Sequence, residues 1–481
     1  MHGPIESPIR HAATPLPAGR VERLIGKPSR EWSASDLVDV IMDEGIRTVS
    51  LMHVGADGWL KTLDFVPLSE SHLKDVLAGG ERADGSSLFA ETGIRPGASD
   101  IVLRPRPSTA FIDPFSRHPT LALMCRHVGR DGKPLAESPD TILRRANDRV
   151  RHETGAELWA LGEVEYFLGK KAMESDVYGA GERGYHAASP FVYGQNLRRE
   201  AMSILGDIGL PVKYGHSEVG YIQATEMEGV IWEQHEIELA LTPLPEAADA
   251  VVLTQWVLRN LAHAAGLRCS FDPIVREGHA GSGLHFHFSP VREGKHLPVF
   301  LTSGALSDEA RWLIGGLALM GGALMAFGNR VEDSFTRLIQ AKEAPSSVTW
   351  GLYNRQALIR IPIQAMTEEG RIVSPPTIEF RLPDGSAHPY LLLAGVAQAL
   401  LQGREIPDLD AAIERTRAPY AAAHPGSATP VPHNFEQIAE AVALHKAALE
   451  KGNVFPEGMI TKLFELLELK GRTQRPSAAA L

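Results

Sequence analysis

Four short segments of the sequence each carry two polar side chains at positions i and i+2. These pairs are Glu163 and Glu165 in ALGEVEYFLG, Gln234 and Glu236 in IWEQHEIEL, His285 and His287 in SGLHFHFSP, and Glu379 and Arg381 in TIEFRLPD. Hydrophobic residues surround every pair, and a β-strand repeats its side-chain direction at every second residue. The spacing therefore predicts four strands, each with a polar pair on one face.

The residue types in these pairs indicate a metal-lined cavity. A half-exposed strand alternates polar and apolar residues in any case, so one pair alone carries little information. Four pairs made mostly of Glu and His differ from a solvated face, which would more often carry Lys, Thr and Ser. Carboxylate oxygen and imidazole nitrogen bind divalent cations. Without cations, several carboxylates around one cavity would repel one another and take up protons, so bound metal is the favoured interpretation.

The bulk properties of the chain exclude several classes of function. With 481 residues, of which 44% are hydrophobic and 22% charged, the composition is globular and the length suffices for two or three cores. A formal net charge of −11, without a cluster of Lys and Arg, argues against nucleic acid as a partner. Cys125 and Cys269 stand far apart, so we expect no disulfide framework and no thiolate metal site, and a cytoplasmic location fits.

Neither the N-terminus nor the most apolar segment predicts contact with a membrane. Residues 1–34 begin with a stretch rich in Pro, Gly and Arg that lacks the apolar core of a secretory signal, and we expect a flexible arm there. Residues 313–328 fall short of the roughly 20 residues that span a bilayer. We expect a buried helix at that position.

The polar strands need surrounding elements that hold them around one cavity. Residues 36–44 predict a short helix capped by Ser35, and residues 46–68 predict a β-hairpin that turns at residues 55–58. After a Pro-rich region, long helical segments alternate with strands, at residues 138–154, 194–209, 244–266 and 310–327. We therefore predict an α+β chain with a small strand-rich domain first and a larger domain whose antiparallel sheet is backed by helices.

An ordered series of motifs extends this interpretation. The series is ADGSSL (83–88), SDIVLRPRPSTAFIDPF (99–115), GEVEYFL (162–168), EQHEIEL (233–239), GSGLHFHFS (281–289), SFTRLIQAKEAP (334–345), NRQALIRIP (354–362) and IEFRLPDGSAHPY (378–390). In this order the motifs resemble the glutamine synthetase family over roughly residues 35 to 400. The resemblance implies a β-grasp domain at residues 35–135 and a catalytic domain at residues 136–481 with a concave antiparallel sheet.

The resemblance also implies a metal-dependent ligase and assigns its residues. One cation, Mg²⁺ or Mn²⁺, would be held by Glu165, Glu218 and Glu236, and a second by Glu163, His285 and Glu379. Arg355 and Arg360 would stabilise the phosphoryl group transferred from ATP, with His287 and Ser289 beside the nucleotide. The implied substrate-binding residues for glutamate and the acceptor are Glu165, Gly281, His285, Arg337, Arg381 and Ser87.

The implied reaction joins glutamate to ammonia. ATP phosphorylates the γ-carboxylate, and ammonia attacks the resulting acyl phosphate. Asp84 matches the acid that binds ammonium and takes its proton, Glu343 matches the flap residue that closes the site against water, and Tyr185 is a weaker match at the amine site. The family assembles as rings, commonly stacked as dodecamers, in which one chain closes its neighbour's site, so we expect a homo-oligomer.

Departures from the family pattern leave the acceptor open. The chain inserts GYIQATEMEGVIW between GHSEV and EQHEI, so the third ligand of the first metal is either Glu218 or Glu228, and the match of GHSEV favours Glu218. His279 and Ala280 stand in the glycine loop where many members have Asp and Asn. Three functions remain: glutamine synthesis, γ-glutamylation of an organic amine such as a polyamine, alkylamine or arylamine, and a non-catalytic structural or regulatory role.

Overall fold

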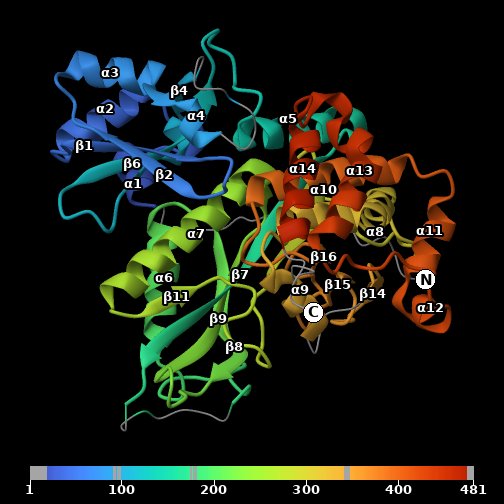
Figure 1. Cartoon of the computed structure of the whole chain (residues 1–481). Coiled ribbons are helices and arrows are strands. Elements are labelled where there is room, and N and C mark those ends of the chain that lie inside the picture. The colour runs from blue at the N-terminus through green and yellow to red at the C-terminus, as the bar shows by residue number, and fades with distance from the viewer. Residues whose placement is uncertain are drawn as a thin grey trace.

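The computed structural model describes residues 19–89, 94, 99–173, 176, 181–340 and 347–473. These residues form two sheets, each associated with its own helices (Figure 1). The smaller sheet, drawn in blue shades at the upper left, is built from the N-terminal quarter of the chain, and the larger sheet follows it. The predicted α+β order, a strand-rich domain before a larger one, is confirmed.

The smaller sheet has the strand order β2-β1-β6-β4-β3, with β5 beside β6. Strand β1 runs parallel to β6 and antiparallel to β2. Helices α2 and α3 contribute Leu37, Ile41, Leu73 and Leu77 to a core that also contains Leu51 of β1. The elements are α1 (Arg20–Ile25), a 3₁₀ turn (Ser29–Glu31), α2 (Ala34–Asp43), β1 (Thr48–Val54), β2 (Leu60–Phe65), α3 (Glu70–Gly79), β3 (Glu81–Asp84), α4 (Gly85–Leu88), β4 (Asp100–Pro105), a 3₁₀ turn (Pro107–Thr109), β5 (Phe111–Ile112) and β6 (Thr120–Val128).

The larger sheet has the order β14-β15-β16-β12-β7-β9-β8, and short strands β10, β11 and β13 extend it. Its pairs are antiparallel except for β14 and β15, which run parallel at one edge. The strands are β7 (Glu157–Lys171), β8 (Val212–Ile222), β9 (Val230–Leu239), β10 (Thr242–Pro243), β11 (Arg268–Ser270), β12 (Leu284–Arg292), β13 (Lys295–His296), β14 (Trp350–Leu352), β15 (Ile359–Ile361) and β16 (Ile378–Phe380).

Helices bury the apolar face of this larger sheet. Phe286 and Phe288 of β12 share one hydrophobic core with Val251 of α7, Leu317 of α8 and Leu393 of α10. The helices are α5 (Pro139–Thr154), α6 (Gln195–Asp207), α7 (Leu244–Ala264), α8 (Asp308–Gly328), α9 (Asp333–Gln340), α10 (Pro389–Arg404), α11 (Leu409–Thr416), α12 (Ala418–Ala423), α13 (Phe435–Glu450) and α14 (Met459–Thr473), with a 3₁₀ turn at Lys451–Asn453. Helix α8 is long and apolar enough to cross a membrane, but 83% of its most apolar 18-residue stretch is buried inside the protein. The prediction of a buried helix at this position is confirmed.

The N-terminal segment differs from the predicted flexible arm over residues 19–34. Helix α1 forms there because Val21 has a place in the core of the smaller sheet. The predicted hairpin is present as β1 and β2. The cap of α2 is Ser33 rather than Ser35, because Ser33 forms a reciprocal capping box with Asp36.

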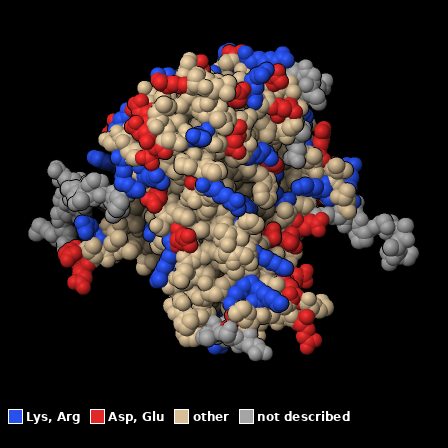
Figure 2. Space-filling model, turned by 90° about the vertical axis from the view of Figure 1, so that its left-hand side faces the viewer, with Lys and Arg blue, Asp and Glu red and all other residues tan. Residues whose placement is uncertain are grey.

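A buried ionic contact joins the two parts of the chain. Arg106, which follows β4, is 7% exposed and donates a hydrogen bond of 2.7 Å to Asp249 of α7. The same Asp249 accepts a hydrogen bond from Tyr390 of α10. On the face shown in Figure 2, Lys and Arg are interspersed with Asp and Glu.

Candidate active site

The register of the larger sheet brings the polar pairs onto one face. His285 lies directly opposite Glu163, and His287 lies directly opposite Glu379. Glu165 lies opposite Glu236 on the other side of β7. Residues opposite one another on neighbouring strands point to the same side of a sheet. The four predicted pairs therefore meet across strands that are up to about 200 residues apart in the chain.

A cavity of about 380 Å³ opens on this polar face. The residues predicted for the site that line it are Glu163, Glu165, Tyr185, Glu218, Glu236, Gly281, His285, Arg337, Arg355, Arg360 and Arg381. Acidic and basic side chains thus surround one space. Such an arrangement can hold cations and a multiply charged anionic substrate together.

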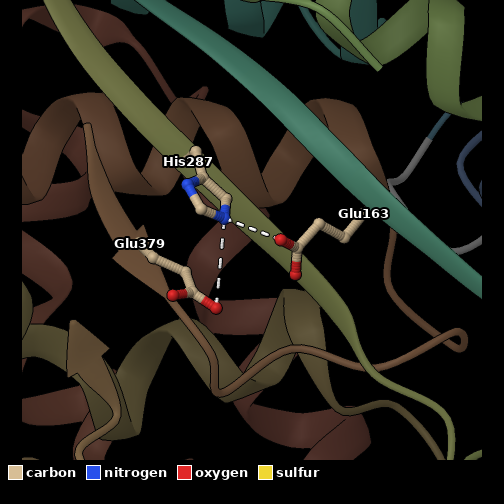
Figure 3. A group of neighbouring side chains, drawn as sticks. All are labelled: Glu163, His287 and Glu379. Atoms are coloured by element: carbon tan, nitrogen blue, oxygen red, sulfur yellow. Dashed lines mark hydrogen bonds and ion pairs between the residues drawn. The ribbon is translucent and has the colours of Figure 1, made fainter. Parts of the chain in front are cut away.

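The first cluster contains Glu163, His287 and Glu379, of which Glu163 lines the cavity and the other two lie behind it (Figure 3). His287 Nε2 lies 2.9 Å from a Glu163 oxygen and 3.9 Å from a Glu379 oxygen. His285 Nδ1 lies 3.0 Å from the other Glu163 oxygen. The structure therefore brings His287 as well as the predicted ligand His285 to the Glu163 carboxylate.

Neighbouring basic side chains keep the carboxylates of this cluster ionised. Burial by itself would raise the pKa of Glu163, but His287 and His285 outweigh it and lower that pKa. Glu379 is fully buried, and His287, Arg381 and Arg360 lower its pKa in spite of burial and the nearby charge of Glu163. These are the ionised forms that a divalent cation requires.

The second cluster contains His216, Glu218 and Glu236. Burial and the charge of Glu165 raise the pKa of Glu218 to about 8. Burial and the charge of Glu163 also raise the pKa of Glu236. These two carboxylates repel their acidic neighbours, so the protein gains by binding a positive charge between them. The predicted ligand Glu165 contributes to that repulsion but is not part of this cluster.

The donor set of both clusters fits divalent cations. Each cluster offers two carboxylates and one imidazole within 4.8 Å of one another. Oxygen donors of this kind bind Mg²⁺ or Mn²⁺, and imidazole favours Mn²⁺. The structural observation that supports this fit is the placement of Glu218 and Glu236 with His216 in one cluster, and the raised pKa values of the two carboxylates agree with a need for a positive partner.

The arginines lie on the wall next to the clusters. Arg360 of β15 and Arg381 both donate to the Glu379 carboxylate. Arg337 of α9 donates to the Leu382 carbonyl oxygen at 3.1 Å and is buried. Gly283 leaves room for it, since a Cβ there would lie 2.9 Å from the Arg337 guanidinium.

Several residues expected at the site lie elsewhere or outside the described residues. Asp84 is exposed at the end of β3, where Ser87 Oγ donates to it at 2.7 Å, and neither residue lines the cavity. Ser289 is buried and contacts His296 at 2.9 Å. Glu228 pairs with Arg276 away from the cavity, which leaves Glu218 as the site residue of the two alternatives.

The flap residue Glu343 lies outside the described residues, so its predicted position stays a prediction.

Sequence reasoning missed four residues that line or adjoin the cavity. His216 forms an i, i+2 pair with the predicted ligand Glu218, so the same spacing would have identified His216. Glu238 continues the polar face of β9 and joins Glu163 and Glu236 in a third acidic group. Glu182 accepts hydrogen bonds from His279 and the Ala280 amide, and nothing in the sequence indicates that contact. Tyr214, at the cavity mouth, likewise has no distinguishing sequence signal.

Comparison with known proteins identifies the family to which these features belong. Residues 136–468 match the family description "Glutamine synthetase, catalytic domain", and residues 45–128 match "Glutamine synthetase, beta-Grasp domain". The glutamine synthetase of Pyrococcus woesei is 31% identical over 363 residues, which are 75% of this chain and 76% of that protein. That of Frankia alni is 28% identical over 470 residues, 91% of this chain and 95% of that protein. The cryo-EM structure of Plasmodium falciparum glutamine synthetase has the same fold, with a TM-score of 0.75 at 18% identity over 93% of this chain and 98% of that one.

Proposed function

The chain belongs to the glutamine synthetase family, and on that premise we propose that it is a ligase that uses ATP to activate the γ-carboxylate of glutamate and transfers the γ-glutamyl group to ammonia. The observation that carries the proposal is one cavity lined by five carboxylates and four arginines. Carboxylates that can hold cations for phosphate and guanidinium groups that can bind carboxylate meet there, as phosphoryl transfer to an amino acid requires.

The arginines would orient glutamate and the phosphoryl group. Arg337 and Arg381 border the cavity next to the glycine loop, and we assign the glutamate carboxylates to them and to the Gly281 backbone. Arg355 and Arg360 also line the cavity, and Arg360 belongs to β15. We assign these two arginines to the γ-phosphoryl group of ATP. When bound, Mg²⁺ or Mn²⁺ at the two clusters would supply the positive charge that neutralises the ATP phosphates.

The chemistry then consists of two transfers. A γ-carboxylate oxygen of glutamate attacks the terminal phosphorus of ATP, ADP leaves, and γ-glutamyl phosphate forms. The nitrogen of ammonia next attacks the acyl carbon, and inorganic phosphate leaves. Asp84 is proposed to bind ammonium and to take the proton that ammonium loses. Ser87 and Ser86 lower the pKa of Asp84 and keep it ionised, which favours binding of a cation.

Asp84 reaches a cavity only if another chain supplies it. It belongs to the smaller sheet and does not line the cavity described here. We therefore propose a homo-oligomer of stacked rings, a dodecamer, in which the smaller domain of one chain closes the site of the next. The proposed location is the cytoplasm.

A second acceptor, an organic amine, is favoured by the cavity mouth. Tyr185, Tyr214 and Val219 line the cavity and are all exposed, although ammonia has no apolar part for them to contact. Aromatic faces attract organic ammonium groups through cation–π contacts. A primary alkylamine or arylamine would place its apolar part against these side chains.

The experiment is a screen of acceptors with ATP, glutamate and Mg²⁺ held constant and phosphate release measured. Ammonia as the most efficient acceptor supports glutamine synthesis, whereas an organic amine that exceeds it supports the second function. Release of phosphate with none of the acceptors above the rate without glutamate would refute the ligase.

A further inference from the structure

Residues 181–188, which we call the Tyr185 segment, lie along strand β8 at one end of the larger sheet. Three backbone amides of the segment donate to carbonyl oxygens of β8, namely Glu182 to Tyr221 at 3.3 Å, Gly184 to Val219 at 3.1 Å and His186 to Ser217 at 2.9 Å. Gly184 permits this close approach, since a Cβ there would lie 2.4 Å from the Glu218 carbonyl oxygen. The segment therefore extends the sheet, and its Glu182 and Tyr185 side chains line the cavity.

Two residues of the Tyr185 segment have a backbone conformation that side chains rarely adopt. Glu182 and His186 each have a φ of 56°, in the left-handed region that favours glycine. Such conformations persist where surrounding contacts impose them, and they are concentrated at binding sites. His186 stacks on the Tyr185 ring, with a centroid distance of 4.2 Å, whereas Glu182 reaches across to a different loop.

The Glu182 carboxylate connects the Tyr185 segment to the glycine loop, which comprises residues 278–283. One of its oxygens accepts a hydrogen bond of 2.9 Å from the Ala280 amide, and the other lies 3.1 Å from His279 Nδ1. Hydrogen bonds to an ionised acceptor are roughly twice as strong as those between neutral groups. One carboxylate thus holds both the backbone and a side chain of the loop.

The sheet anchors the glycine loop at two further points. The Gly283 amide donates to Glu165 of β7 at 2.8 Å. The Gly281 carbonyl oxygen accepts a hydrogen bond of 3.0 Å from Gln234 of β9. Gly281, to which we assign a contact with glutamate, therefore lies between the anchors on the sheet and the contact at Ala280.

We propose that Glu182 is a positioning residue, whose carboxylate holds the Ala280 side of the glycine loop against the Tyr185 segment and thereby sets the affinity for glutamate and for the acceptor. The proposal rests on the proposed ligase function, because it deepens the assignment of Gly281 to glutamate and of Tyr185 to the acceptor. It makes the loop and the Tyr185 segment one unit, so that loosening one side of the cavity loosens the other.

The first test measures the loop itself and needs no substrate. Hydrogen–deuterium exchange of the full chain, followed by mass spectrometry, reports on the peptide that contains the Ala280 amide. The variants are Glu182→Ala, Glu182→Gln and His279→Ala, and thermal unfolding establishes that each is folded. Glu228→Ala is the matched control, because Glu228 pairs with Arg276 just before the loop but does not line the cavity.

We expect Glu182→Ala to accelerate exchange of the Ala280 amide by about 10-fold to 100-fold, the equivalent of one lost hydrogen bond to a charged acceptor. Glu182→Gln keeps an oxygen that can accept from the amide, so it should recover most of the protection. His279→Ala should have a smaller effect, because the bond at Ala280 remains, and Glu228→Ala should have none. Unchanged exchange in folded Glu182→Ala, or an equal acceleration in Glu228→Ala, overturns the proposal.

The second test separates positioning from a general loss of structure. Arg360, assigned to the phosphoryl group, is held by Glu379 and not by the glycine loop, so binding of ATP should not depend on Glu182. In the phosphate-release assay, Glu182→Ala should raise the KM for glutamate and for the acceptor by about tenfold or more and change the KM for ATP and kcat by less than about threefold. An unchanged KM for glutamate, or an equal rise in the KM for ATP, overturns the proposal. An unsubstituted protein that releases no phosphate with any acceptor would refute the ligase, and the exchange measurement would still decide whether Glu182 holds the loop.

Discussion

Replacing Arg106 with methionine should strongly destabilise the protein, because it leaves a buried carboxylate without a partner. Asp249 is 4% exposed and would keep only its hydrogen bond from Tyr390. Asp140, the other carboxylate near Arg106, would keep Arg144 at 3.0 Å. Breaking one partner of a buried ion pair costs about 3–5 kcal/mol. We expect a loss of that size in the free energy of unfolding, measured by urea titration.

The chain supplies a matched control for this prediction. Arg417 contacts Glu414 through two hydrogen bonds of 2.6 Å and 2.9 Å, a better geometry than that of Arg106, but both side chains are almost half exposed. Arg417→Met should change the free energy of unfolding far less than Arg106→Met, since water replaces the lost contact.

A second substitution distinguishes a lost charge pair from lost packing. Adding Asp249→Asn to Arg106→Met removes the uncompensated charge, so the double variant should lose less stability than the sum of the single changes, by about 1–3 kcal/mol. If Arg106→Met costs no more than Arg417→Met, or if the two changes at the Arg106–Asp249 pair simply add, the assignment of this contact as a buried charge pair is refuted.

Three further predictions address the site and its assembly. A chelator should abolish phosphate release, and an active metal-stripped sample would contradict this. Glu379→Gln should lower the rate of phosphate release by several orders of magnitude, because Arg360, Arg381 and the first cluster would lose the negative charge of Glu379. Burial lowers the pKa of His53 to about 4 and that of His127 to about 3, so below about pH 6.5 the unfolded chain binds protons that the folded chain does not. The free energy of unfolding should therefore fall from pH 6.5 towards pH 4 by about 1.4 kcal/mol per pH unit for each histidine. A urea midpoint that is constant over this range would contradict the prediction. Mixed oligomers of Asp84→Ala and Arg337→Ala subunits should regain activity if each site combines two chains, and no recovery in verified mixed oligomers would mean that one chain builds each site.

Local patterns were sufficient to predict the long helices and the strands that carry the site. The predicted helix at residues 138–154 is α5, Pro139–Thr154, because its apolar periodicity and the Pro at its first position are local signals. The polar pairs were predicted for the same reason, since the period of a strand is two residues. The cap of α2 was misassigned by two residues because two serines precede the helix and only the capping box with Asp36 distinguishes them.

The hydrogen-bond partners of the site residues could not be predicted from the sequence, because they depend on the register of the strands and on the path of the loops. Nothing local indicates that Glu165 hydrogen-bonds with the Gly283 amide or that Glu182 reaches the Ala280 amide. These contacts join segments about 100 residues apart.

The strand register that brings the site residues together is also the register that the hydrophobic core favours. Along β12, His285 and His287 face the cavity side, and Leu284, Phe286 and Phe288 alternate with them into the helical core. A slip of one residue would turn the phenylalanines towards the acidic clusters and bury the histidines among apolar side chains. Either change is costly, since it exposes large aromatic groups and buries polar ones without partners. The hydrophobic core therefore stabilises not only the fold but also the one alignment in which His287 meets Glu379 and His285 meets Glu163.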